Sequence, residues 1–200
     1  MFPGRILLLL VFALPSVAQL SSGQYPDNRE RFNAYLYNTY ADPVRLGWLL
    51  IDSAEATWSR DPHQWDRSAE SYSYRVASGM GRRIVRNTAL LGFETLLHED
   101  SRYRPSLEHS LGKRMLFAIR HSVLAYKPDG SVEPAYARIA AGVVAAATSS
   151  TWHPQSIEAG CLLSGVGQVA IDRAGNNLLA EFEPELRHFG RKTWNQIIRK

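Results

Sequence analysis

The chain has 200 residues, a formal net charge of +4 and one cysteine, Cys161. This length suits one domain that buries a core without metal or disulfide staples, and a lone cysteine excludes a disulfide within the chain. The excess of positive charge is small and the arginines are interspersed with acids, whereas nucleic-acid binders concentrate Lys and Arg on one face, so we expect no nucleic-acid partner.

The first residues have the pattern of a secretory signal peptide. Arg5 gives a basic start, residues 6–14 are apolar, and Ser16-Val17-Ala18 is a cleavage site of small residues. The apolar run is far shorter than the roughly 20 residues that cross a bilayer, so we expect cleavage after Ala18. The working protein is then expected in the periplasm or cell envelope, as residues 19–200 with a net charge of +3.

Signals for helices follow one another along the rest of the chain. Residues 19–26 are expected to form a linker and residues 27–200 a single helical domain. A first helix is predicted over residues 32–40, where apolar side chains recur at helical spacing after Asp27 or Asn28 as cap. Asp42-Pro43, a cap followed by proline, predicts a second helix to about Trp58.

Similar periodicity continues to the end of the chain. Further helices are predicted over residues 68–97, 106–122, 134–151 and 156–182, with a last helix from Glu183-Pro184. Residues 98–105 are predicted to form a loop and residues 127–130 a turn. Because no run alternates as a half-buried strand does, the predicted fold class is all-α, a bundle of about six to seven helices.

Small side chains recur every four residues along two of these helices. The ridge positions are Ala69, Ser73, Ala77 and Gly81, and Ala137, Ala141 and Ala145. Such ridges let helix backbones approach closely, in membranes above all but also in soluble crossings. We therefore expect both ridges to lie in helix crossings. The uncharged stretch 139–157 is a poor membrane span because His153-Pro154 interrupts it, which favours a soluble or peripheral bundle.

One group of residues could carry hydrolytic chemistry. Glu94 and His98 are four residues apart on one predicted helix face, Glu99 and Asp100 follow directly, and His109 and His121 lie on the next predicted helix. In a metal-assisted hydrolase of an envelope component, the first two would be metal ligands, with His109 or His121 as a third, and Glu99 or Asp100 the base. The alternative is an ordinary helix end with ion pairs, since the spacing matches no metalloprotease motif. We favour this non-enzymatic alternative and expect no cofactor.

The last predicted helix separates basic from apolar side chains. Arg187, Arg191 and Lys192 lie opposite a face that contains Trp194 and Ile198. Such a helix can lie in an anionic lipid surface, or it can pack its apolar stripe on the domain with the basic groups in water. With the export signal, it favours a cell-envelope protein that meets a membrane surface, an envelope protein partner or a second copy of itself.

Four segments carry a resemblance to a known group of proteins. They are residues 61–65, 98–103, 152–154 and 181–186. With them the chain resembles an uncharacterised family of exported, mostly helical envelope proteins from Gram-negative soil bacteria. Members often have Asp-Pro-Arg-Tyr where this chain has residues 100–103, and Trp-Pro-Asp at residues 183–185. The resemblance implies export and a helical fold, and it assigns no functional residue because the family has no assigned activity.

Overall fold

The computed structural model describes residues 25–153, 159–186 and 188. The chain divides into two compact units. The large unit comprises Tyr25–Ser101 and Leu124–Ala170, and the small unit contains Arg102–Val123 and the described residues from Ile171 onward. The signal peptide and most of the predicted linker lie outside the described residues, and so do the basic and apolar positions predicted for the last helix, Arg187, Arg191, Lys192, Trp194 and Ile198.

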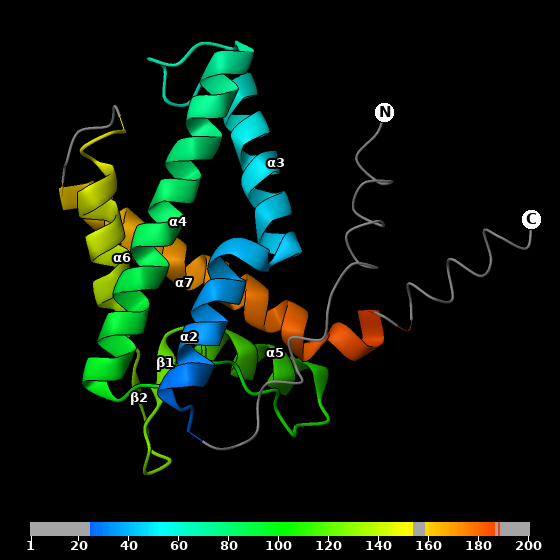
Figure 1. Cartoon of the computed structure of the whole chain (residues 1–200). Helices are drawn as coiled ribbons and strands as arrows, with labels where there is room; N and C mark the ends of the chain where they lie inside the picture. Colours follow the sequence, from blue (N-terminus) through cyan, green and yellow to red (C-terminus); the bar gives the residue numbers. More distant parts are fainter. Residues whose placement is uncertain (1–24, 154–158, 187, 189–200) are drawn as a thin grey trace, which may run out of the picture. The chain divides into compact units, whose positions relative to one another are not determined.

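The all-α prediction is confirmed, since helices make up most of the described chain (Figure 1). The elements in chain order are α2 (Asn28–Leu36), the π-helical turn η2 (Tyr37–Ala41), α3 (Pro43–Ser59), α4 (Ala69–Leu97), α5 (Leu111–Arg120), β1 (Leu124–Tyr126), β2 (Val132–Pro134), α6 (Tyr136–Ser149) and α7 (Ala159–Glu181). Helix α5 belongs to the small unit, and α7 passes from the large unit into the small one.

The first three helices begin at the predicted caps. Asp27 accepts a hydrogen bond from Glu30 N at 2.6 Å, and Asp42 accepts from Val44 N at 3.1 Å. Ser68 Oγ likewise accepts from Ser71 N at 3.1 Å, at the start of α4. Each side chain satisfies a backbone donor that the first helical turn leaves without a partner. These starts are therefore fixed by local chemistry.

The fourth predicted helix begins later than its sequence suggests. It starts at Leu111 and not at Ser106, because Ser106 N and Oγ bind the carboxylate of Glu181, at 2.9 and 2.7 Å. The turn at residues 127–130 is confirmed, but it joins two short strands that the sequence did not reveal. Strands β1 and β2 pair antiparallel with three residues each, too few for a visible alternation.

Helix α4 lies beside both α3 and α6 in the large unit (Figure 1). The ridge on α6 is confirmed as a packing face, since Ala137, Ala141 and Ala145 are all buried. On α4 the prediction of a helix crossing is wrong for the first three ridge positions, because Ala69, Ser73 and Ala77 are exposed. The buried face of α4 is instead a polar one, formed by Ser71, Arg75, Ser78, Arg83 and Asn87.

The tightest contact at a glycine of α4 also falls at a position other than Gly81. A Cβ atom added to Gly79 would overlap Cδ1 of Leu49 on α3, whereas one added to Gly81 would lie 3.6 Å from Trp152, an ordinary contact. On α6, a Cβ added to Gly142 would lie 3.3 Å from Val169 Cγ2 on α7. Glycine therefore allows close packing at positions 79 and 142, while Gly81 faces the side chain of a tryptophan.

Candidate functional site

The residues predicted as a hydrolytic cluster lie where α4 ends. Glu94 accepts a hydrogen bond from the Ser101 hydroxyl and forms an ion pair with Arg31, whose Nη1 is 3.6 Å from Glu94 Oε2. His98 follows the last residue of α4 with a left-handed backbone, φ 52°, and its side chain is exposed. The cluster therefore does not converge on His98.

Glu99 and Asp100 point into the interior and are 0 % and 1 % exposed. Glu99 Oε2 accepts a hydrogen bond from Ala137 N at 3.0 Å, in the first turn of α6. A negative charge at a helix N-terminus satisfies a free N–H group and interacts favourably with the helix dipole. The backbone of Asp100 pairs with that of Tyr126 on β1, with N···O distances of 2.8 and 3.0 Å. Both residues thus have structural positions that a solvent-borne substrate does not reach.

Arg138 completes a network of buried charges. Its Nη2 donates to Ser101 O at 3.1 Å, and the residue is 6 % exposed. Burial lowers the pKa of Arg138, and the charges of Glu94 and Glu99 act in the opposite direction. Buried charges need partners of opposite sign, because desolvation costs several kcal/mol for each ion. Together with Arg31, these side chains join the end of α4 to the start of α6 and to α2.

The predicted ligands of the large unit, Glu94 and His98, do not gather with a third ligand among its described residues. Among the residues that the structure describes, no three His, Cys, Asp or Glu side chains gather in a group that could hold a metal ion. His109, one of the two candidates for a third ligand, is exposed and belongs to the small unit, whereas Glu94 and His98 belong to the large one. The structure therefore adds no support for the hydrolase alternative.

A second buried carboxylate, in the small unit, escaped the sequence reasoning. Glu181, 2 % exposed, accepts hydrogen bonds from Tyr103 Oη at 2.7 Å and Arg114 Nε at 2.8 Å, besides those from Ser106. Burial opposes ionisation of Glu181, but these donors outweigh it and lower the pKa to about 2. Arg114 also pairs with the exposed Glu185 at 2.5 Å. So many partners fix the loop before α5 to the end of α7.

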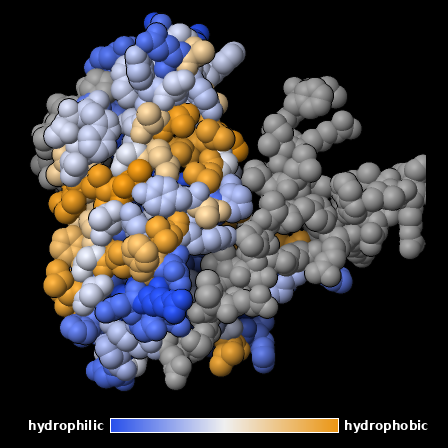
Figure 2. Space-filling model, viewed as in Figure 1, coloured by the Kyte–Doolittle hydropathy of each residue, from blue (hydrophilic) through white to orange (hydrophobic). Residues whose placement is uncertain are grey.

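Large apolar side chains of the large unit lie mainly outside its interior. Exposed examples are Trp48, Leu50 and Ile51 on α3, and Ile139, Val143 and Val144 on α6. Figure 2 shows apolar side chains gathered over α3 and α6, on either side of α4. By contrast, among the residues whose burial the structure describes, the buried aliphatic side chains are those of alanines and of Pro26 and Pro62, and no aromatic side chain is buried. We call these exposed apolar side chains, Trp48, Leu50, Ile51, Ile139, Val143 and Val144, the apolar face.

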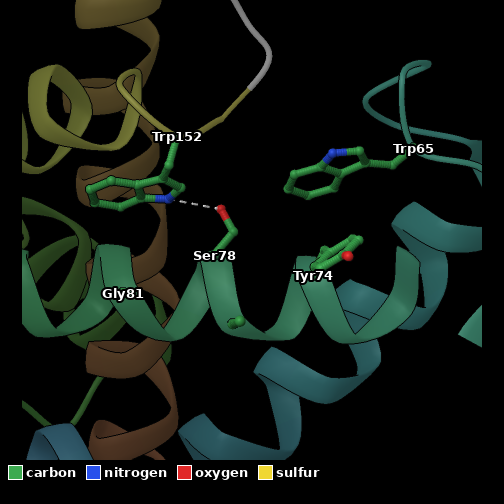
Figure 3. Close-up of a pocket in the computed structure, with 6 residues that line it drawn as sticks. Trp65, Tyr74, Ser78, Gly81 and Trp152 are labelled. Carbon is green, nitrogen blue, oxygen red and sulfur yellow. Dashed lines mark hydrogen bonds between the residues drawn. The ribbon is translucent and has the colours of Figure 1, made fainter. Parts of the chain in front are cut away.

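A hollow of about 510 Å³ lies on the same unit, over α4 (Figure 3). It is lined by Trp65, Tyr74, Ala77, Ser78, Gly81 and Trp152. Trp152 lies on one side, above Gly81, and Trp65 and Tyr74 lie on the other side. The small residues at positions 77 and 81, predicted as a crossing, thus line a hollow that three aromatic rings flank.

Both tryptophans are held by polar contacts behind their rings. Arg75 donates to the carbonyl oxygens of Asp61 at 2.9 Å, Trp65 at 2.8 Å and Asp66 at 3.0 Å, so it fixes the loop that carries Trp65. Its guanidinium carbon also lies 5.6 Å from the centre of the Trp65 ring. On the other side, Trp152 Nε1 donates to Ser78 Oγ at 3.2 Å (Figure 3). The aromatic rings are therefore preorganised.

Charged groups lie around the hollow. Tyr74 donates its hydroxyl hydrogen bond to Glu70 Oε1 at 2.6 Å. The His153 ring packs on Trp65, with ring centres 5.2 Å apart. Burial, and then the charges of Arg82 and Arg75, lower the pKa of His153, with Asp61 acting in the opposite direction.

Comparison with known proteins adds no assignment to this geometry. No protein-family model, curated protein or solved structure matches the chain. Among the described helices, none has the length and apolar content needed to cross a membrane.

Proposed function

We propose that the chain is an exported, non-enzymatic protein of the cell envelope that associates with a membrane surface through its apolar face. The observation that carries this proposal is the reversal of the usual distribution in the large unit. Arg31, Arg75, Arg83 and Arg138 are buried there, while large apolar side chains of α3 and α6 are exposed. In soluble domains Leu, Ile, Val and Phe are the residues most often buried, and Arg is seldom buried.

The buried polar network makes this distribution understandable. Ion pairs and hydrogen bonds among α2, α4 and α6 hold the interior together, so the outer side chains are available for another apolar phase. Exposed apolar side chains that gather in this way mark sites of association with proteins or membranes. A lipid surface is favoured by the predicted export and by the predicted basic last helix, because anionic headgroups attract such a segment.

The direct test is flotation of the purified mature protein with vesicles. We expect the protein to float with vesicles of phosphatidylcholine and phosphatidylglycerol. Leu50→Glu should lower the partition coefficient of the protein between buffer and vesicles by about tenfold or more, because it removes apolar contact and places a charge in the interface. The control is Gln64→Glu, which adds the same charge at an exposed polar position of the same unit and should change binding less than about twofold. Absence of flotation, or equal losses in both variants, would refute the proposal.

The predicted basic helix gives a separate expectation. Replacing both Arg191 and Lys192 by glutamine should weaken binding to anionic vesicles by about thirtyfold, since each basic residue near such a surface contributes about 1 kcal/mol and every 1.4 kcal/mol is a factor of about ten. Binding to pure phosphatidylcholine vesicles should not change. Equal weakening on both kinds of vesicle would show that these residues act on the fold and not on the lipid charge.

A further inference from the structure

We propose that the hollow over α4 binds a planar aromatic ring that carries a negative charge, such as an aryl carboxylate. The ring would lie against Trp65, Tyr74 and Trp152, and the anionic group would point toward Arg82. This site is distinct from the apolar face, and the proposal does not depend on membrane association.

Size and surface chemistry select a ring. Small-molecule sites usually have volumes of roughly 300–1,000 Å³ and mostly apolar walls, and the hollow has about 510 Å³. Two polar groups of its walls already have partners, since Trp152 donates to Ser78 and Tyr74 donates to Glu70. A sugar would find few free hydrogen-bond partners there. A flat aromatic ring needs none, and it gains from stacking on the indole and phenol rings.

The positions of the walls leave a defined place for such a ring. Trp152 and the pair formed by Trp65 and Tyr74 stand apart along α4, and the helix between them carries Ala77 and Gly81 (Figure 3). A Cβ atom added to Gly81 would already lie 3.6 Å from the Trp152 ring, so a larger side chain at this position would press on that ring and extend into the hollow. The hollow therefore exists because these residues are small.

Charge selects an anion. Arg82 follows Gly81 on α4 and is exposed, and Arg75 lies against Trp65. Glu70 accepts the hydrogen bond of the Tyr74 hydroxyl and keeps its negative charge, so the anionic group is expected at the other end of the hollow, toward Gly81 and Arg82. Electrostatic complementarity then favours a negatively charged ring over an aromatic ammonium compound.

The experiment uses the full mature chain in buffer without lipid and 2-naphthoate as the probe. Binding is followed by the indole N–H resonance of Trp152, which is assigned from its loss in Trp152→Phe. We expect a saturable shift of this resonance. We also expect the cationic naphthylmethyl-trimethylammonium to bind about tenfold more weakly than 2-naphthoate. Arg82→Gln should weaken the binding of 2-naphthoate and leave the affinity for the neutral 2-naphthalenemethanol unchanged.

A pair of glycines on α4 supplies the control. Gly81→Leu should weaken the binding of 2-naphthoate by about tenfold or more, because the leucine fills the hollow. Gly92→Leu should change the affinity less than about twofold, because nothing lies within 4 Å of a Cβ added at Gly92. Should Gly81→Leu not fold, Ala77→Leu fills the same space from an exposed position. The proposal is overturned if Trp152 does not respond, if filling the hollow leaves affinity unchanged, or if decanoate or the ammonium probe binds more tightly than 2-naphthoate.

Discussion

Replacing Glu99 by alanine is expected to lower the free energy of unfolding by about 3–5 kcal/mol, the range for breaking a buried charge pair. The variant removes the acceptor for Ala137 N at the start of α6, and it removes a negative charge that faces the buried Arg138. Urea unfolding at pH 7 measures the change. Since whole domains are stable by only about 5–15 kcal/mol, Glu99→Gln is the second variant if the alanine variant does not fold.

The control for Glu99 is another glutamate of the large unit. Glu133 on β2 is exposed and pairs with Lys127 at 3.6 Å. Exposed pairs contribute little, so Glu133→Ala should cost less than about 1 kcal/mol. Similar costs for the two variants would contradict the structural position of Glu99. If Glu99→Ala unfolds with the same free energy as the wild type, Glu99 has no structural role and is again a candidate catalytic base.

The second large effect is expected at Glu181 in the small unit. Its pKa is lowered from 4.5 to about 2 in the folded protein, so the folded state favours the ionised form. This contribution is fully present above pH 4.5 and is lost as the pH falls toward 2. Glu181→Gln should therefore cost about 2–3 kcal/mol at pH 7, and the difference from the wild type should shrink to about 1 kcal/mol at pH 3.

Glu185 provides the matched comparison, because it binds the same arginine from an exposed position. Its side chain is 51 % exposed, and Glu185→Gln should cost less than about 1 kcal/mol at pH 7. Unfolding curves in urea at pH 7 and pH 3 check both variants. A Glu181→Gln cost that does not depend on pH would show that packing, and not charge, stabilises this site.

Sequence patterns predicted those features that depend on near neighbours. The starts of α2, α3 and α4 follow from Asp27, Asp42 and Ser68, whose side chains cap backbone groups only a few residues away. Ser106 has the same local appearance, yet its hydroxyl binds Glu181, which is 75 residues away in sequence. A cap signal cannot reveal a competing partner at that distance.

The ridges show the same limit. Helical spacing identified the small residues of both α4 and α6, but only the α6 ridge is buried. Periodicity reports which residues share a face, and it does not report which face meets a neighbour. On α4 the buried face carries Arg75 and Arg83, which a hydrophobic pattern assigns to solvent.

The aromatic hollow was beyond local reasoning. Trp65, Tyr74 and Trp152 come from a loop, a helix and a helix end, and only packing brings them together. Two of the segments that carry the family resemblance, residues 61–65 and 152–154, nevertheless contain both tryptophans. This coincidence was the one available signal, and it indicated particular residues without indicating that they meet.

The small size of the buried apolar side chains, which are alanines besides Pro26 and Pro62, has a consequence for the response to temperature. Unfolding raises the heat capacity by about 0.45 cal/K/mol for each Å² of apolar surface exposed and lowers it by about 0.26 for each Å² of polar surface. An interior of small apolar groups and buried Arg, Glu and Asn side chains exposes less of the first and more of the second. We expect calorimetry to give a heat-capacity change below the usual range of about 12–15 cal/mol/K per residue. The stability of this chain should therefore vary little between cold and warm conditions.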